Sequence, residues 1–173
     1  MLHWLSTTGT AAIVEFPGVL YRGGKEQKIR QYLIDNNFVD CVIQLPANLF
    51  FGVSIATCII VLKKSKKDNG VLFIDATNEF IHSGNKNKLT DENIEKILNA
   101  YIERTDKDHF AKLVPNDEIG KNDYNISVSS YVEQEDLREA VDIKQLNASL
   151  IEIVAKQILQ TKAKLNRMLA ENT

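Results

Sequence analysis

LPANLFFGVSIATCIIVLKK, residues 45–64, is a proline-marked aromatic loop that runs directly into a β-branched strand. The apolar run at residues 39–44 predicts another strand just before this loop, and Pro46 ends it because proline cannot donate to a strand ladder. Residues 57–63 predict the strand after the loop, since β-branched side chains favour extended backbone. The stretch therefore predicts two strands of one sheet joined by a loop.

The residues around this stretch add two strands and a helix. Residues 11–16, AAIVEF, form a nearly continuous apolar run, which predicts a strand covered on both faces. Residues 25–36 predict a helix, and residues 71–75 predict a further strand. The helix places three apolar side chains on one side: Ile29, Tyr32 and Leu33. This strand–helix–strand–strand order predicts one edge of an open α/β sheet.

The composition changes after residue 77. Residues 78–88 are polar and asparagine-rich, which predicts a loop. Thr90 is a good N-cap for the helix that follows, because its hydroxyl accepts from a free backbone N–H. The apolar residues of that helix recur at spacings of three and four: Ile94, Ile97, Leu98 and Tyr101. Residues 105–135 show only weak patterning.

Residues 142–172 contain neither proline nor glycine and predict one long helix. Its apolar residues alternate at spacings of three and four, which is typical of a coiled-coil seam. They are Ile151, Val154, Ile158, Leu165 and Met168. We therefore divide the chain into part of a sheet domain (1–77), a helix with an irregular connecting region (78–141) and a long C-terminal helix (142–173).

The composition indicates an ordinary globular protein. The 173 residues suffice for one sizeable domain, and the formal net charge of −2 gives the whole molecule no attraction to nucleic acid. Cys41 and Cys58 lie in apolar strand patterns, where a buried reduced thiol is usual. The chain has no secretory signal pattern and no apolar run near the ~20 residues that span a membrane. We expect a cytoplasmic protein without membrane contact.

Several catalytic patterns are missing from this sequence. No glycine-rich phosphate loop opens a helix after a strand, and there is no nucleophile elbow. His3, His82 and His109 are scattered without other ligands at metal-binding spacing, so we expect no metal site. These residues alone are predicted to catalyse nothing.

Two stretches carry a resemblance to a known family. GTAAIVEFPGVLYRGG at residues 9–24, together with residues 45–64, resembles the modification (M) subunit of type I restriction–modification systems. That family consists of adenine-specific DNA methyltransferases that use S-adenosylmethionine. Residues 71–80, 89–98 and 122–132 continue the resemblance in the family's order, so it covers nearly the whole chain.

The resemblance implies a particular fold. Residues 9–24 match the fifth sheet strand and its loop, residues 25–36 the next helix, and residues 39–64 the final hairpin, whose last strand is antiparallel. The implied architecture is α/β: a partial Rossmann-like methyltransferase sheet, with its last strands and one crossover helix, followed by a mostly helical C-terminal region.

The family's cofactor motif and its Asn-Pro-Pro-aromatic catalytic motif precede the matching region. Neither occurs here, since none of the three prolines, Pro17, Pro46 and Pro115, fits that motif. The resemblance therefore implies a C-terminal fragment that methylates adenine only when complete. S-adenosylmethionine is expected in the complete enzyme and not in this chain alone. The alternative function is a non-catalytic interaction module that binds the specificity subunit or DNA.

The resemblance also implies site residues. Phe51 matches by position the aromatic side chain that packs against the flipped adenine, with Phe50 as the second candidate; alternatively, both are core residues. Arg22 and Lys25 stand at a helix start that suits phosphate, and Lys63 and Lys64 belong to a lysine cluster able to follow a DNA backbone. The alternative for these cations is a role as ordinary solvated surface charges.

The predicted partners follow from the same resemblance. The C-terminal helix is expected to contact the helical spacer of the specificity (S) subunit, unless its apolar stripe docks on the chain's own domain. DNA, the restriction (R) subunit and the N-terminal portion of the M subunit complete the expected assembly. A first strand without its neighbour would also expose backbone and apolar surface, which favours self-association of the fragment.

Overall fold

The computed structural model describes residues 2–134, 147, 150–158 and 160–162. They belong to two compact units, Met1–Glu135 and Asp136–Thr173, and each is described by itself. The elements of the first unit follow in chain order: η1 (Leu2–Trp4), β1 (Thr10–Glu15), η2 (Pro17–Leu20), α1 (Lys25–Asp35), β2 (Val39–Gln44), β3 (Cys58–Lys63), β4 (Gly70–Asp75), β5 (Ile81–Ser83), β6 (Lys86–Lys88), α2 (Asp91–Glu103), β7 (Ala111–Pro115), α3 (Asn116–Lys121) and η3 (Val128–Ser130).

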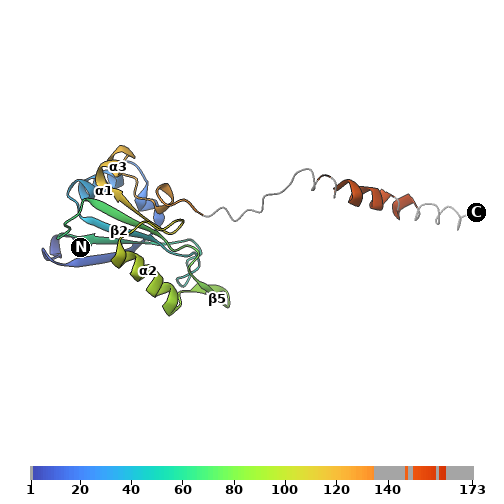
Figure 1. The fold of residues 1–173 in the computed structure, drawn as a ribbon, viewed down its shortest axis with the longest axis horizontal. Coiled ribbons are helices and arrows are strands. Elements are labelled where there is room, and N and C mark those ends of the chain that lie inside the picture. Colours follow the sequence, from blue (N-terminus) through green and yellow to red (C-terminus); the bar gives the residue numbers. More distant parts are fainter. Residues whose placement is uncertain (1, 135–146, 148–149, 159, 163–173) are drawn as a thin grey trace, which may run out of the picture. The chain divides into compact units, whose positions relative to one another are not determined.

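A five-stranded mixed sheet in the order β1-β3-β2-β4-β7 forms the centre of the first unit (Figure 1). β2 is parallel to β4, whereas β3 is antiparallel to both β1 and β2, and β7 is antiparallel to β4. The predicted strand at residues 39–44 is confirmed with the same bounds, and β3 and β4 each begin within one residue of their predicted starts. The fold is therefore mixed α/β, as the sequence predicts.

The first strand differs from its prediction. β1 alternates between exposed and half-buried residues and is not covered on both faces. It pairs only with β3 among the described strands, so its other flank carries no neighbouring strand. Val14 is 50% exposed and Phe16, just after the strand, is 52% exposed. The apolar run reflects a sheet margin with one open flank.

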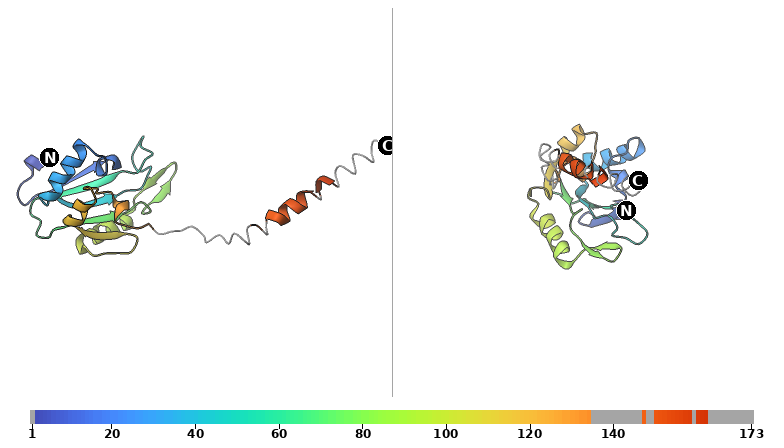
Figure 2. Two further views of the ribbon diagram at one scale, coloured as in Figure 1. Left: turned by 90° about the horizontal axis from the view of Figure 1, so that it is seen from above. Right: turned by 90° about the vertical axis from the view of Figure 1, so that its right-hand side faces the viewer.

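Helices cover both faces of the sheet (Figures 1 and 2). α1, α3 and η3 lie on one face, where the core is built around Phe73 and Tyr131, whose rings stack at 4.4 Å. α2 covers the other face and packs Ile97 and Ala100 into a second cluster of buried residues. Within the described ranges no helix is both long and apolar enough to cross a membrane.

The two cysteines are buried free thiols, as predicted, and they lie on opposite faces of the sheet. Burial raises the pKa of Cys58 to about 11. Burial likewise raises the pKa of Cys41, and the neighbouring Asp40 carboxylate adds to this effect. Both thiols are therefore protonated and unreactive at neutral pH.

The helix predicted at residues 25–36 is confirmed as α1, which ends one residue earlier. Its buried residues are Arg30 and Ile34, whereas Ile29 and Tyr32 are 60% and 56% exposed. The Arg30 guanidinium donates to the carbonyl of Val19 at 2.9 Å and to that of Tyr124 at 2.7 Å. Desolvation lowers the pKa of Arg30 from its ordinary value. Of the three apolar residues predicted to share one side, Leu33 packs against the core, whereas Ile29 and Tyr32 remain largely exposed.

The predicted boundary near residue 77 does not mark the end of the sheet. β7 pairs with β4 and adds a fifth strand, and α3 and η3 pack against the same core. The region after residue 78 also contains the β5–β6 hairpin, so its described part is not mostly helical. α2 begins as predicted: Thr90 caps it by accepting from the backbone N–H of Asn93 at 3.3 Å.

Candidate nucleic-acid interface

The loops at one end of the sheet are the natural place for a ligand. β1, β2 and β4 run in the same direction, because β3 is antiparallel to β1 and β2 while β4 is parallel to β2. Their carboxyl ends lie together, and the loops 16–24, 45–57 and 76–80 begin there. Ligands of open α/β sheets bind beside the carboxyl ends of the strands. We call this end of the sheet the carboxyl end.

The loop 45–57 presents an aromatic side chain to solvent. Phe51 is 93% exposed and Phe50 is 40% exposed, so neither is a core residue. A turn joins the backbone N–H of Val53 to the carbonyl of Phe50 at 3.2 Å, and Gly52 takes the positive φ of 73° that this turn requires. The turn thus holds Phe51 at the tip of the loop.

The β5–β6 hairpin fastens this loop. The Asn87 side chain donates to the carbonyl of Ala47 at 2.8 Å, and its backbone N–H donates to the carbonyl of Asn48 at 3.1 Å. The Lys86 ammonium lies 4.2 Å from the centroid of the Phe51 ring. An ammonium on an aromatic face is attracted by the ring quadrupole. Two consecutive residues of β6 therefore hold the loop's backbone and its exposed aromatic side chain.

Sequence reasoning missed Lys86 and Asn87 because residues 78–88 read as a polar loop. One local signal pointed to a hairpin: Gly84 and Asn85 form a two-residue turn between short strands, and Gly84 has a φ of 61°. Glycine followed by asparagine is a known hairpin-turn pair.

The four predicted phosphate-binding residues do not share one face. Arg22 and Lys25 are exposed at the carboxyl end, where Arg22 lies in the loop after β1 and Lys25 is the first residue of α1. Lys63 ends β3, whose six residues rise about 17 Å from Cys58, so it lies at the opposite end of the sheet. Lys64, next to it, donates to the carbonyl of Leu5 at 2.6 Å. The four residues therefore divide into two pairs at opposite ends of the sheet.

Arg22 also has a local partner, because its Nη1 lies 3.7 Å from a carboxylate oxygen of Glu26. The pair is one helical turn apart and largely exposed, so it contributes little to stability. In the lysine cluster at the end of β3, Lys66 has stronger local partners. Lys66 donates to the carbonyls of Val39 and Gly70 at 2.7 Å each, and desolvation lowers the pKa of its ammonium. Lys66 is therefore a structural cation and not a DNA contact.

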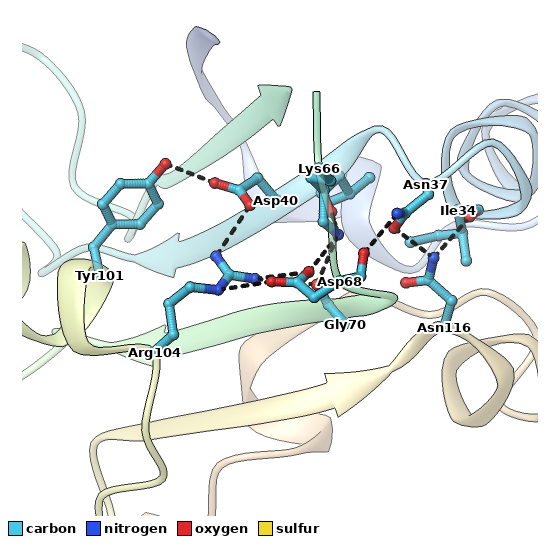
Figure 3. Close-up of polar contacts among 10 residues, drawn as sticks. Ile34, Asn37, Asp40, Lys66, Asp68, Gly70, Tyr101, Arg104 and Asn116 are labelled. Carbon is cyan, nitrogen blue, oxygen red and sulfur yellow. Dashed lines mark hydrogen bonds and ion pairs between the residues drawn. The ribbon is translucent and has the colours of Figure 1, made fainter. Parts of the chain in front are cut away.

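A buried polar cluster occupies the end of the sheet opposite the carboxyl end (Figure 3). Asp40, which is 3% exposed, accepts from Tyr101 Oη at 2.6 Å and from Arg104 Nη1 at 3.0 Å. Arg104 also pairs with Asp68, with 3.3 Å between Nε and Oδ2. Desolvation and the hydrogen bond to Asp40 raise the pKa of Tyr101. Lys66 also lies 3.9 Å from Asp68, so the cluster contains two cations and two carboxylates. Through Tyr101 and Arg104 it holds α2 against the sheet.

A second polar contact in Figure 3 joins α1 to α3. Asn116 Nδ2 donates to the carbonyl of Ile34 at 3.0 Å and to Asn37 Oδ1 at 3.0 Å. Asn37 in turn donates to the carbonyl of Asp68 at 2.7 Å. These bonds satisfy the end of α1 and link it to the loop before β4.

At the carboxyl end of β4, Asp75 is a buried carboxylate with its bonds already made. Its Oδ1 accepts from the backbone N–H of Thr77 at 2.9 Å and from the Thr77 hydroxyl at 2.5 Å, and its Oδ2 accepts from Gln134 at 3.3 Å. Such a carboxylate shapes the turn after the strand. Among the described residues, no three His, Cys, Asp or Glu side chains gather in a way that would hold a metal ion.

In the second unit, the described residues between 150 and 162 are helical and exposed. Of the predicted subunit contacts, Ile151 is 71% exposed, Val154 is 50% exposed and Ile158 is 61% exposed. Leu165 and Met168 lie outside the described residues. The three described side chains share one side of the helix, so an apolar stripe is present there.

Comparison with known proteins identifies the class. The chain belongs to the N-6 DNA methylase family, whose model matches residues 1–140. Within that family, it is similar to methylase subunits of type I restriction enzymes. It is 52% identical over 165 residues to the MpnII methylase subunit of Mycoplasma pneumoniae, and 43% identical over 150 residues to the MjaVIII methylase subunit of Methanocaldococcus jannaschii. The matches cover 94% and 83% of this chain but 30% and 26% of those proteins.

Solved structures agree with this assignment. The type I restriction–modification methyltransferase subunit from Streptococcus thermophilus is 47% identical and superposes with a TM-score of 0.75, over 76% of this chain and 28% of that one. The EcoKI M protein shares the fold at 16% identity and a TM-score of 0.57, over 87% of this chain and 40% of that one. The resemblance to type I M subunits is therefore confirmed, and the chain corresponds to part of such a subunit.

Proposed function

We propose that this chain is the C-terminal portion of an adenine-specific DNA methyltransferase subunit and supplies one wall of its target-base pocket. The observation that carries the proposal is the open flank of β1 in a chain of the N-6 DNA methylase family. In this proposal β1, β2 and β3 are the last strands of a Rossmann-like sheet. α1 is the crossover helix between β1 and β2, and β2 and β3 form the final hairpin. The remaining strands come from the N-terminal portion of the subunit.

The surface beside β1 supports this arrangement. An apolar groove of about 260 Å³ runs between α1 and the sheet, and its lining includes Ile13, Ile29, Leu33 and Ile60. Ile29 is 60% exposed there, next to a strand whose outer backbone groups have no described strand partner. A free strand edge beside exposed apolar side chains is a surface that another chain segment covers. We propose that the N-terminal portion of the M subunit covers it.

The cofactor does not fit the residues of this groove. S-adenosylmethionine carries an amino acid group and a sulfonium, which need polar partners. The lining is mainly apolar, and its charged members are Glu15, Glu26 and Arg30. Arg30 borders the groove, but its Nε and Nη1 already donate to two backbone carbonyls. We therefore place the cofactor site on the N-terminal portion of the subunit, together with the catalytic residues.

Phe51 is the residue through which this chain would act on the substrate. The target adenine has to leave the duplex before its exocyclic amine is methylated, and aromatic side chains hold such bases by stacking. A ring that is 93% exposed at the tip of a fastened loop offers a stacking surface without rearrangement of the core. Stacking of this kind contributes about 1–3 kcal/mol per base. Phe50, at 40% exposed, is the second candidate.

The test replaces Phe51 in the complete subunit assembled with its partners. Phe51→Ala should lower methylation of adenine by about 5- to 150-fold, which corresponds to the loss of one stacking contact, while the complex still assembles. Trp4→Ala is the matched control, because Trp4 is 87% exposed but belongs to η1, near the opposite end of the sheet. Unchanged turnover in Phe51→Ala would reject the base-stacking role.

The exposed helix of the second unit favours a further role in assembly. Ile151, Val154 and Ile158 present apolar surface that a helical partner would bury. We propose the specificity subunit as that partner, within a complex that also holds DNA and the restriction subunit. Deletion of residues 142–173 should abolish binding to the specificity subunit in a pull-down, and retained binding would refute this contact. A chain that binds that subunit without any effect on methylation would be a non-catalytic interaction module.

A further inference from the structure

Two lysines in this unit lie over aromatic rings, and they differ in one respect. Lys96 lies 4.5 Å from the centroid of Phe110 and is also paired with Glu79, while Phe110 is 8% exposed. Lys86 lies 4.2 Å from the centroid of Phe51, which is 93% exposed. None of the ion pairs recorded among the described residues involves Lys86. Lys96 therefore stabilises the fold, whereas the charge of Lys86 is available.

The hairpin presents a second cation beside the first. Lys86 and Lys88 are two residues apart on β6, so their side chains leave the same face of the hairpin. Asn87 between them leaves the other face and donates to Ala47 in the loop 45–57. Lys88 is exposed and, like Lys86, belongs to none of these ion pairs. The hairpin thus combines a loop anchor with two adjacent positive charges.

We propose that Lys86, with Lys88 beside it, binds the DNA phosphates that flank the nucleotide whose base stacks on Phe51. This inference rests on the proposed function, because it assigns a role to the neighbours of the base pocket. The Lys86 ammonium, which has no carboxylate partner among the described residues, lies against an exposed ring and places a positive charge next to the stacking surface. Proteins that hold unpaired nucleotides combine these two features: aromatic faces for bases and cations for the backbone.

The charge of the whole chain strengthens the argument. With a formal net charge of −2, these 173 residues have no general attraction to DNA, so any attraction that they contribute comes from local cations. The hairpin lies over the loop 45–57 at the carboxyl end of the sheet, as the bonds of Asn87 show. Lys63 lies at the opposite end. Lys86 is therefore better placed than Lys63 to contact a nucleotide at Phe51.

The test measures how DNA affinity depends on salt, because each neutralised phosphate adds about 0.9 to the slope of log affinity against log salt. The full-length methylase subunit in its assembled complex would be titrated with a fluorescent duplex that contains its methylation sequence. Anisotropy would be followed between about 50 and 200 mM salt. Lys86→Gln removes the charge, Lys86→Arg keeps it, and Lys67→Gln removes an exposed charge from the turn after β3.

We expect Lys86→Gln to reduce the magnitude of the slope by about 0.9, and Lys86→Arg to retain the wild-type slope. Lys67→Gln should leave the slope unchanged. A wild-type slope in Lys86→Gln, or the same loss in Lys67→Gln, would overturn the proposal. Thermal melting of each variant confirms that the fold is intact, which we expect because no hydrogen bond of the Lys86 side chain is recorded in the described structure.

The two proposals fail separately. If Phe51→Ala loses methylation while Lys86→Gln keeps the wild-type slope, the base pocket stands and the phosphate contact is wrong. If Phe51→Ala methylates normally while Lys86→Gln loses the slope, the hairpin contacts DNA but the stacking role is wrong, and with it the claim that these phosphates flank the stacked base.

Discussion

Tyr101 on α2 donates a hydrogen bond of 2.6 Å to Oδ2 of Asp40 on β2, 61 residues earlier in the chain. The other oxygen of Asp40 accepts from Arg104 at 3.0 Å, and the carboxylate is almost fully buried. Polar groups withdrawn from water in this way stabilise a fold only when every partner is present. The position of α2 on the sheet therefore depends on this carboxylate as well as on apolar packing.

Replacement of Asp40 by alanine should destabilise the protein strongly. Arg104 and Lys66 would lose a buried counter-charge, and removal of one partner from a buried ion pair costs about 3–5 kcal/mol. Urea denaturation measures the free energy of unfolding. Asp68→Ala is the control, because the Asp68 side chain is 50% exposed and its ion pairs should contribute less than about 1 kcal/mol. Equal losses in the two variants would contradict the account of the cluster.

The raised pKa of Tyr101 should make the protein lose stability at alkaline pH. Burial and the bond to Asp40 raise the pKa of Tyr101 in the folded state above its unfolded value. The phenol then keeps its proton in the folded protein while the unfolded chain loses it above about pH 10. The stabilisation is complete below that pH and is lost as the pH rises toward the folded pKa. Tyr101→Phe should therefore show a shallower decline of unfolding free energy above about pH 10.

Other groups titrate in the same pH range, so the wild-type profile serves as the control for Tyr101→Phe. Burial raises the pKa of Cys41 and Cys58 and acts in the same direction, whereas it lowers the pKa of Lys66 and acts in the opposite direction. These groups are common to the wild type and to Tyr101→Phe, so the difference between the two profiles isolates Tyr101. Parallel profiles above about pH 10 would show that the phenol is not perturbed.

The hydrogen bonds of Asn87 should make the loop that carries Phe51 rigid. Asn87→Ala removes the side-chain bond to Ala47, while the backbone bond to Asn48 remains. A lost hydrogen bond of this kind costs about 1 kcal/mol, so the loop should open more often by about fivefold. Amide hydrogen exchange at residues 47–53 should accelerate by that factor. Exchange at β4 is the internal reference, and equal acceleration there would indicate global destabilisation instead.

The sequence predicts the middle of the sheet well. β2, β3 and β4 are buried for most of their length, so their runs of apolar and β-branched residues report strands directly. The apolar run of β1 has the same appearance for another reason. It belongs to a strand with only one described neighbour, and its outer side chains remain exposed. Hydrophobicity alone does not distinguish a covered strand from one with an open flank.

The candidate site is less predictable because its parts meet only in three dimensions. The exposure of Phe51 follows from a turn and a hairpin, which are both short and polar. Such segments show no hydrophobic periodicity from which they could be predicted. The burial of Arg30 follows from two backbone carbonyls: that of Val19 in η2, 11 residues earlier, and that of Tyr124, 94 residues later. Lys63 and Lys66 look equivalent in sequence, yet the Lys66 ammonium donates to the carbonyls of the first residues of β2 and β4, Val39 and Gly70.

The central claim is that β1 pairs with a strand of the N-terminal portion of the M subunit. Hydrogen exchange of the β1 amides, measured with and without that portion added as a separate chain, tests it most directly. β1 bonds to β3 on one flank, so the N–H groups that face the other flank should exchange freely in this chain alone. We predict that these amides become protected when the N-terminal portion binds. Binding with no change in their exchange would contradict the claim.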